Sequence, residues 1–190
     1  MLGGLDSGFT LIELMVVLLI MAILLAIAIP TFLGVKGGAQ DRAAQSNLNT
    51  ALTNAKAVYG NNQSYGSTSA ALQASLSSTE PSLTFTTGLN ASTGQNVISV
   101  ETDAGGGGSP AGSAIILTNL SSSGDCWAIL TNEVNVGSGD KNADGLATGW
   151  PETTGGTWYS VWKSSATAPC SAVWPVGGET WVRGSFPNAV

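Results

Sequence analysis

The stretch FTLIELMVVLLIMAILLAIAI, residues 9–29, contains only two polar residues, Thr10 and Glu13. A helix of this length would span roughly 31 Å, about the thickness of the hydrocarbon core of a bilayer. A secretory signal peptide has a shorter apolar core, followed by a cleavage site made of small residues. The stretch therefore predicts a transmembrane helix near the N-terminus.

Residues 30–60 continue as a helix with a different pattern. Pro30 removes a helical hydrogen bond, and three glycines lower helix propensity before residue 39, so we expect the helix to kink or loosen there. Apolar residues then recur every three or four positions and form one apolar stripe, whereas Asp41 is placed off the stripe. Gly60 and the two asparagines after it, Asn61 and Asn62, are the predicted stop of the helix. The stripe consists of Ala44, Leu48, Ala51, Leu52, Ala55 and Val58.

Residues 61–190 predict a β-rich head domain. Residues 64–78 are expected to form a loop with a short helical piece, and later segments rich in β-branched and aromatic residues predict strands. The fold class is thus α+β, a long helix packed on a small antiparallel sheet. The predicted strands are Leu83–Thr86, Val97–Thr102, Ala114–Leu120, Trp127–Thr131, Trp158–Lys163 and Thr180–Arg183.

The six tryptophans all lie in the last third of the chain. We expect them to form the core of the sheet, and the alternative is an exposed surface that binds sugars. Trp158 and Trp162 have equal parity within one predicted strand, so they should share a face.

Composition argues against several classes of function. The chain has 6 basic and 12 acidic residues and no histidine, which gives a net charge of −6. This charge repels phosphate backbones, so nucleic-acid binding is not the default interpretation. The sequence also has no metal-ligand cysteine spacing and no phosphate loop, and we expect a protein that is not an enzyme.

Glu13 is the most informative residue of the apolar stretch. A carboxylate inside a bilayer costs several kcal/mol, so it is either a charge tolerated near the interface or a group that awaits a positive partner. The stretch contains no Lys or Arg. The remaining cation that a chain can offer there is a free α-amino group. That group would require cleavage after Gly8, so that the chain begins at Phe9.

The hexapeptide GFTLIE, residues 8–13, followed by an apolar run, resembles the class III signal of type IV prepilins and of the related pseudopilins of type II secretion. The resemblance implies that a prepilin peptidase removes residues 1–8 by cutting between Gly8 and Phe9, and N-methylates Phe9. It implies that Glu13 pairs with the Phe9 amine of a neighbouring subunit. Pro30 falls where the family carries a proline, near which the helix stretches on assembly.

The resemblance also implies a function. The chain would be a structural subunit of an extracellular type IV pilus, a helical homopolymer built by inner-membrane assembly machinery. The precursor would reside in the cytoplasmic membrane with its leader in the cytoplasm. This placement overrides the orientation that Lys36 and Arg42, after the apolar run, would give by the positive-inside rule.

Three alternatives remain at the level of sequence. The first is a pseudopilin of a type II secretion system. The second is a minor tip pilin that binds DNA or a surface ligand. The third is a monomeric anchored surface protein, in which Glu13 would have no partner.

The two cysteines, Cys126 and Cys170, allow two interpretations. Export would favour a disulfide between them, whereas a reducing compartment would keep two free thiols. The apolar N-terminal segment indicates export, and the family resemblance implies the disulfide that closes the C-terminal loop of many pilins.

Asp140, Asn142 and Asp144 alternate with other residues before Gly145, as in the first half of an oxygen-rich calcium loop. The position that should hold the closing glutamate is Pro151. The alternative is a polar turn, which Asp, Asn and Gly form without metal. Calcium at these three residues is the one cofactor that the sequence suggests.

Overall fold

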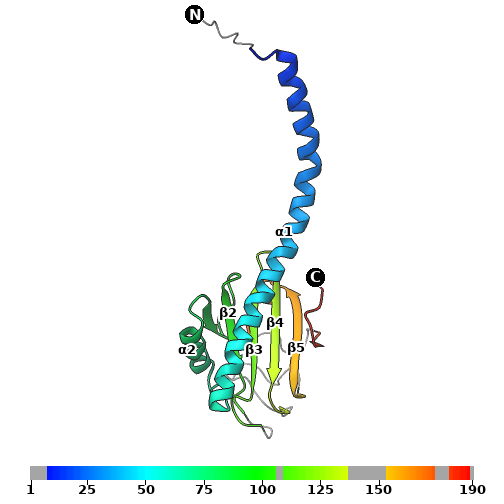
Figure 1. Cartoon of the computed structure of the whole chain (residues 1–190). Coiled ribbons are helices and arrows are strands. Elements are labelled where there is room, and N and C mark those ends of the chain that lie inside the picture. Colours follow the sequence, from blue (N-terminus) through cyan, green and yellow to red (C-terminus); the bar gives the residue numbers. More distant parts are fainter. Residues whose placement is uncertain (1–7, 106–108, 137–152, 174–179, 189–190) are drawn as a thin grey trace, which may run out of the picture. The chain divides into compact units, whose positions relative to one another are not determined.

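The computed structural model describes residues 8–105, 109–136, 153–173 and 180–188 (Figure 1). The chain forms two compact units, Met1–Gly38 and Ala39–Val190. The elements are α1 (Leu11–Asn62), α2 (Ser69–Thr79), β1 (Thr84–Thr87), β2 (Val97–Thr102), β3 (Ala114–Leu120), β4 (Asp125–Asn132), β5 (Gly156–Lys163) and β6 (Val182–Arg183). A long helix followed by a β-rich unit confirms the predicted α+β class.

Helix α1 runs through Pro30 without interruption, so the expected loosening of the helix is not seen here. Proline removes one helical hydrogen bond, and the remaining bonds of the surrounding turns hold the helix. Beside Pro30, the hydroxyl of Thr31 donates to the carbonyl of Ile27 at 2.5 Å. The helix ends at Asn62, the last residue of the predicted stop, and Gln63 after it adopts a left-handed φ of 54°.

The six strands form one sheet in the order β1-β2-β3-β4-β5-β6. The predicted bounds of β2 and β3 match the structure, and the other strands shift by a few residues. The expectation of an antiparallel sheet needs one correction, because β1 and β2 pair in parallel. Residues 88–96 carry the chain back to the starting end of β1, so β2 runs in the same direction. The other neighbouring pairs are antiparallel.

The predicted apolar stripe of α1 is buried against the sheet. Figure 1 shows this part of α1 lying over β3 and β4. Ala44, Leu48, Ala51 and Ala55 are fully buried, and Leu52 is partly buried. Three of these four buried residues are alanines, whose small side chains let the helix lie close to the strands. The sheet contributes Ile98, Val100, Ile115, Leu117, Trp127 and Ile129 to this core.

The opposite face of the sheet is closed by the disulfide between Cys126 and Cys170, which confirms the predicted pairing. Trp158 and Trp162 lie on this face, in agreement with their equal parity, and pack into two small apolar clusters. Trp162 is buried, while Trp158 is partly buried. The described tryptophans therefore belong to the core, as expected. Trp150 and Trp174 lie outside the described residues.

Asp41 was predicted to lie off the buried stripe, and this prediction is wrong. It is 7% exposed and lies one helical turn before Ala44 on the same face of α1. The hydroxyl of Ser123 and the indole Nε1 of Trp127 donate to Oδ1 of Asp41. The charge of Asp41 indicated an exposed side chain, but its spacing of three residues from Ala44 places it on the stripe.

The surroundings of Asp41 favour its charged form. Burial raises the pKa of the carboxyl, whereas hydrogen bonds from Ser123, Ser121 and Trp127 lower it. The positive charge of Lys163 lowers it further, and the net result is a pKa below the usual value of an aspartate. The carboxylate thus stabilises the contact between α1 and the sheet.

Replacing Asp41 by Asn should lower the free energy of unfolding at pH 7 by about 1–2 kcal/mol, because charged hydrogen bonds become neutral ones. The pKa of the folded state is lowered, so this contribution is complete above about pH 3.9, the unfolded value, and is lost as the pH falls further. Urea unfolding of both chains in detergent micelles, followed by tryptophan fluorescence, measures the difference. A difference between the two chains that is equally large at pH 3 and pH 7 would contradict the assignment.

Candidate assembly site

The N-terminus of α1 is organised by a reciprocal cap between Thr10 and Glu13. Oε2 of Glu13 accepts hydrogen bonds from the backbone N–H of Thr10 at 2.9 Å and from its hydroxyl at 2.7 Å. The Thr10 hydroxyl oxygen in turn accepts from the backbone N–H of Glu13 at 3.3 Å. This is a capping box, which satisfies donors that the first helical turn leaves free. Glu13 therefore helps to begin the helix.

No role was predicted for Thr10 from the sequence, although the signal was present. A threonine followed three residues later by glutamate, before an apolar run, is the sequence signature of a capping box. The charge of Glu13 drew attention to an external partner, and its local partner was missed.

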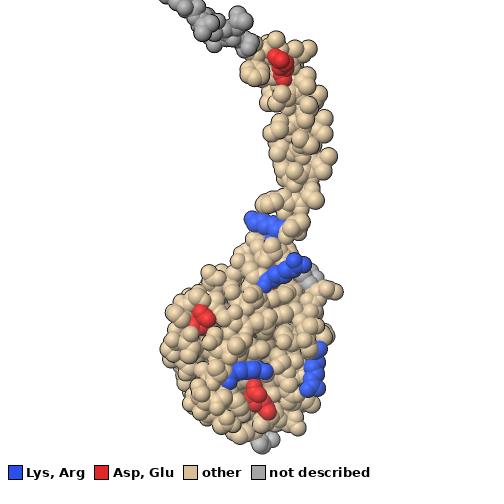
Figure 2. Space-filling view, viewed as in Figure 1, with Lys and Arg blue, Asp and Glu red and all other residues tan. Residues whose placement is uncertain are grey.

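The apolar part of α1 is exposed on all sides within the described residues. Residues 9–36 are all exposed, and Phe9 is 89% exposed. One helix of the described chain, α1, is long and apolar enough to cross a membrane, and its most apolar window has no buried residue. Figure 2 shows a surface along this part that is almost free of charge. Such a surface requires lipid or other apolar surface around it.

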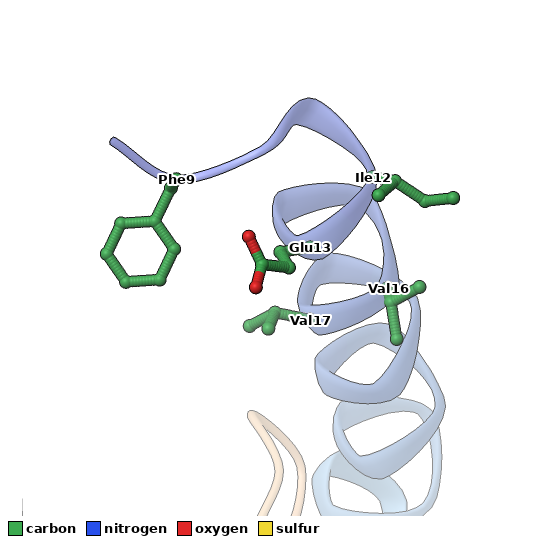
Figure 3. Close-up of a pocket in the computed structure, with 5 residues that line it drawn as sticks. All are labelled: Phe9, Ile12, Glu13, Val16 and Val17. Carbon is green, nitrogen blue, oxygen red and sulfur yellow. The ribbon is translucent and has the colours of Figure 1, made fainter. Parts of the chain in front are cut away.

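Beside Glu13, the helix surface has a shallow, mostly apolar groove lined by Phe9, Ile12, Glu13, Val16 and Val17. Figure 3 shows the carboxylate on the same side of the helix as the Phe9 ring and Val17. Among the described residues, no donor contacts Oε1 of Glu13. The first basic residue along the chain is Lys36, which lies roughly 35 Å farther along a helix. Along the described part of α1, therefore, no basic side chain lies near this oxygen.

The other predicted site residues fall in different places. Gly8 is the first described residue and precedes the cap, and Pro30 lies exposed within α1, far along the helix from Glu13. Cys126 and Cys170 form the disulfide of the β-rich unit. Asp140, Asn142 and Asp144 lie outside the described residues. No cluster of metal-binding side chains occurs in the part of the chain that the structure describes.

Comparison with known proteins adds two findings. Residues 5–29 match the family model described as the prokaryotic N-terminal methylation motif. Over 80 residues the chain is 41% identical to the type IV wide pilus major component PilA4 of Thermus thermophilus. The matched region covers 42% of this chain and 61% of that relative. No solved structure shows a significant match to the chain.

These findings confirm the resemblance to type IV pilins that residues 8–13 indicated. The long helix packed on a sheet is a pilin-like α+β fold. Pilins are structural proteins, so the comparisons also agree with the prediction that the chain is not an enzyme.

Replacing Thr10 by Val should leave the first turn of α1 without its side-chain cap, at a cost of about 1 kcal/mol. The backbone amide of Glu13, which donates to the Thr10 hydroxyl, and that of Leu14, which donates to the Thr10 carbonyl, would then exchange with solvent about five times faster, as measured by NMR on the chain in detergent micelles. Replacing Thr10 by Ser keeps a hydroxyl and should preserve the protection. Equal exchange in the Val variant and the unmodified chain would show that the cap contributes nothing.

Proposed function

We propose that this chain is the structural subunit of an extracellular type IV pilus, assembled through α1. The observation that carries the proposal is the exposed apolar surface of residues 9–35, which holds a single charged side chain, Glu13. Packing many such helices into a bundle replaces lipid with apolar protein surface. A filament is therefore a stable environment for this helix outside the membrane.

Cleavage between Gly8 and Phe9 would supply the missing cation. The amide nitrogen of Phe9 becomes a charged amine when the peptide bond before it is cut. Oε2 of Glu13 is already occupied by Thr10, while Oε1 has no described donor. The amine of a neighbouring subunit would bind this oxygen, because an unpaired carboxylate in a low-dielectric bundle is penalised by several kcal/mol. The pair would also fix the axial register of each incoming subunit.

The comparisons support both parts of this proposal. The match to the N-terminal methylation motif covers the cleavage position and Phe9, which supports processing by a prepilin peptidase. The relative from Thermus thermophilus is named as a major component of a type IV wide pilus. That name favours a major subunit over the pseudopilin and minor tip-pilin alternatives. The chain would wait in the cytoplasmic membrane, engage the inner-membrane assembly machinery and end on the cell surface.

Replacing Glu13 by Val or Gln should leave the chain in the membrane and lower the yield of sheared filaments about tenfold or more, because the amine of the neighbour loses its counter-charge. Immunoblots of membranes and of sheared surface material measure both pools. Replacing Ile12 by Val is the matched control, since it alters the adjacent apolar position and keeps the charge.

The Gln variant separates charge from shape, because it retains a similar volume and an acceptor oxygen for Thr10. Filament yield from the Gln variant equal to that of the Ile12 control would refute the proposed ion pair.

A further inference from the structure

Two charged side chains bound the apolar part of α1, Glu13 near its beginning and Lys36 at its end. The sequence holds no charged residue between them. Residues 14–35 span about 33 Å as a helix, close to the roughly 30 Å hydrocarbon core of a bilayer. Both charged residues are exposed and belong to the unit Met1–Gly38, so one helix sets their spacing. They can therefore lie in opposite headgroup layers at the same time.

The interval between the two charges suits lipid on every side. None of residues 14–35 is buried within the chain. The interval has one side-chain hydrogen-bond donor, the hydroxyl of Thr31, which donates to the backbone carbonyl of Ile27 at 2.5 Å. A polar group surrounded by lipid has to be satisfied within the protein. Thr31 meets this requirement within its own helix.

The depth of the helix in a bilayer has two solutions, which place Glu13 differently. Centring the apolar stretch, residues 9–29, puts Leu19 at the midplane and Glu13 about 6 Å inside the hydrocarbon boundary. Centring the interval between Glu13 and Lys36 puts residues 24–25 at the midplane and both charges about 17 Å from it, beyond the boundary. The second solution avoids the cost of a carboxylate in hydrocarbon.

The two ends of the interval differ in how their charges are satisfied. At the first end, Thr10 donates two hydrogen bonds to Oε2 of Glu13, and a carboxylate is favourable at a helix N-terminus. At the other end, no acidic side chain of the described residues forms an ion pair with Lys36. The next acidic residue along the chain, Asp41, is held by Ser123 and Trp127. Lys36 therefore needs an anion from outside the chain.

A phospholipid headgroup supplies such an anion at this depth. The long apolar stem of a lysine lies along the helix, while its ammonium group extends to the headgroup layer. An ammonium group binds phosphate as a point charge, and a lysine next to the membrane is attracted to anionic lipids. We propose that Lys36 binds the phosphate group of a phospholipid and, together with Glu13, sets the depth of α1, so that residues 14–35 span the bilayer.

This inference rests on the membrane stage of the proposed function and gives it a geometry. With residues 14–35 in the hydrocarbon core, Phe9 and Glu13 lie in the headgroup layer, at the face where residues 1–8 would be removed. The new amine would then form beside the carboxylate in a wet environment, before either group enters a helix bundle. On assembly, Lys36 would leave its lipid phosphate.

The first test locates the bilayer midplane along α1. The full-length chain is placed in vesicles of phosphatidylethanolamine and phosphatidylglycerol that contain lipids with a nitroxide at the end of the acyl chain. The nitroxide broadens the solid-state NMR signals of nearby backbone amides. Broadening should be strongest at residues 24–25. A maximum at Leu19 would show that the apolar stretch alone sets the depth.

The second test changes the charge at the end of the interval. Lys36→Gln should move the maximum of broadening towards Leu19 by at least about two residues, or ~3 Å, because the phosphate contact is lost. Lys36→Arg is the matched control, since it keeps a cation that binds phosphate, and its maximum should stay at residues 24–25. Lys36 is exposed and lies outside the buried stripe, so both variants should fold.

The third test identifies the bound group. In vesicles and a buffer free of inorganic phosphate, the labelled side-chain nitrogens of lysine should show dipolar coupling to lipid phosphorus. Lys36→Gln should remove this coupling, and Lys56→Gln, which removes an exposed lysine of the other unit, should keep it.

Two further results would overturn the proposal: an unchanged midplane in the Lys36→Gln chain, or phosphorus coupling that survives in it. None of the three tests requires filaments. A chain that spans the bilayer with residues 14–35 and yet forms no filaments would contradict the proposed function and leave this inference standing.

Discussion

The exposed apolar surface of residues 9–35 is the constraint on which the rest of the structure depends. Burial of apolar surface is the main favourable term in folding and association, and no residue in this part of α1 is buried within the chain. It must therefore be covered from outside, first by lipid and then, in our account, by copies of the same helix. The β-rich unit keeps the rest of the chain folded while that exchange takes place.

Helix α1 has two parts that differ in composition and in what covers them. Its first part is apolar on every face, and its second part is a narrow stripe of alanine and leucine that lies against the sheet. Asp41 and its hydrogen-bonding partners stand at the beginning of the second part. Glu13 stands at the beginning of the first, where Thr10 holds one of its oxygens and leaves the other to a cation. Each carboxylate is thus placed where the environment of the helix changes.

Much of the fold could be predicted from the sequence, because periodicity and turn residues are local signals. The stripe from Ala44 to Val58 and the bounds of β2 and β3 follow from such signals. The parallel pairing of β1 with β2 could not be predicted, because it depends on the path of residues 88–96. Asp41 was misplaced because its charge was weighed above its spacing. In the candidate site, the importance of Glu13 was predicted, whereas the capping role of Thr10 became clear only from the structure.

The most direct test of the central claim is the intact mass and N-terminal sequence of the chain recovered from sheared surface filaments. The account predicts a chain that begins at N-methylated Phe9 and is two hydrogens lighter than the reduced form, because of the disulfide between Cys126 and Cys170. That result would show processing, export and polymerisation in one sample. A chain found only in membranes, with residues 1–8 still attached, would contradict the account and favour an anchored monomer.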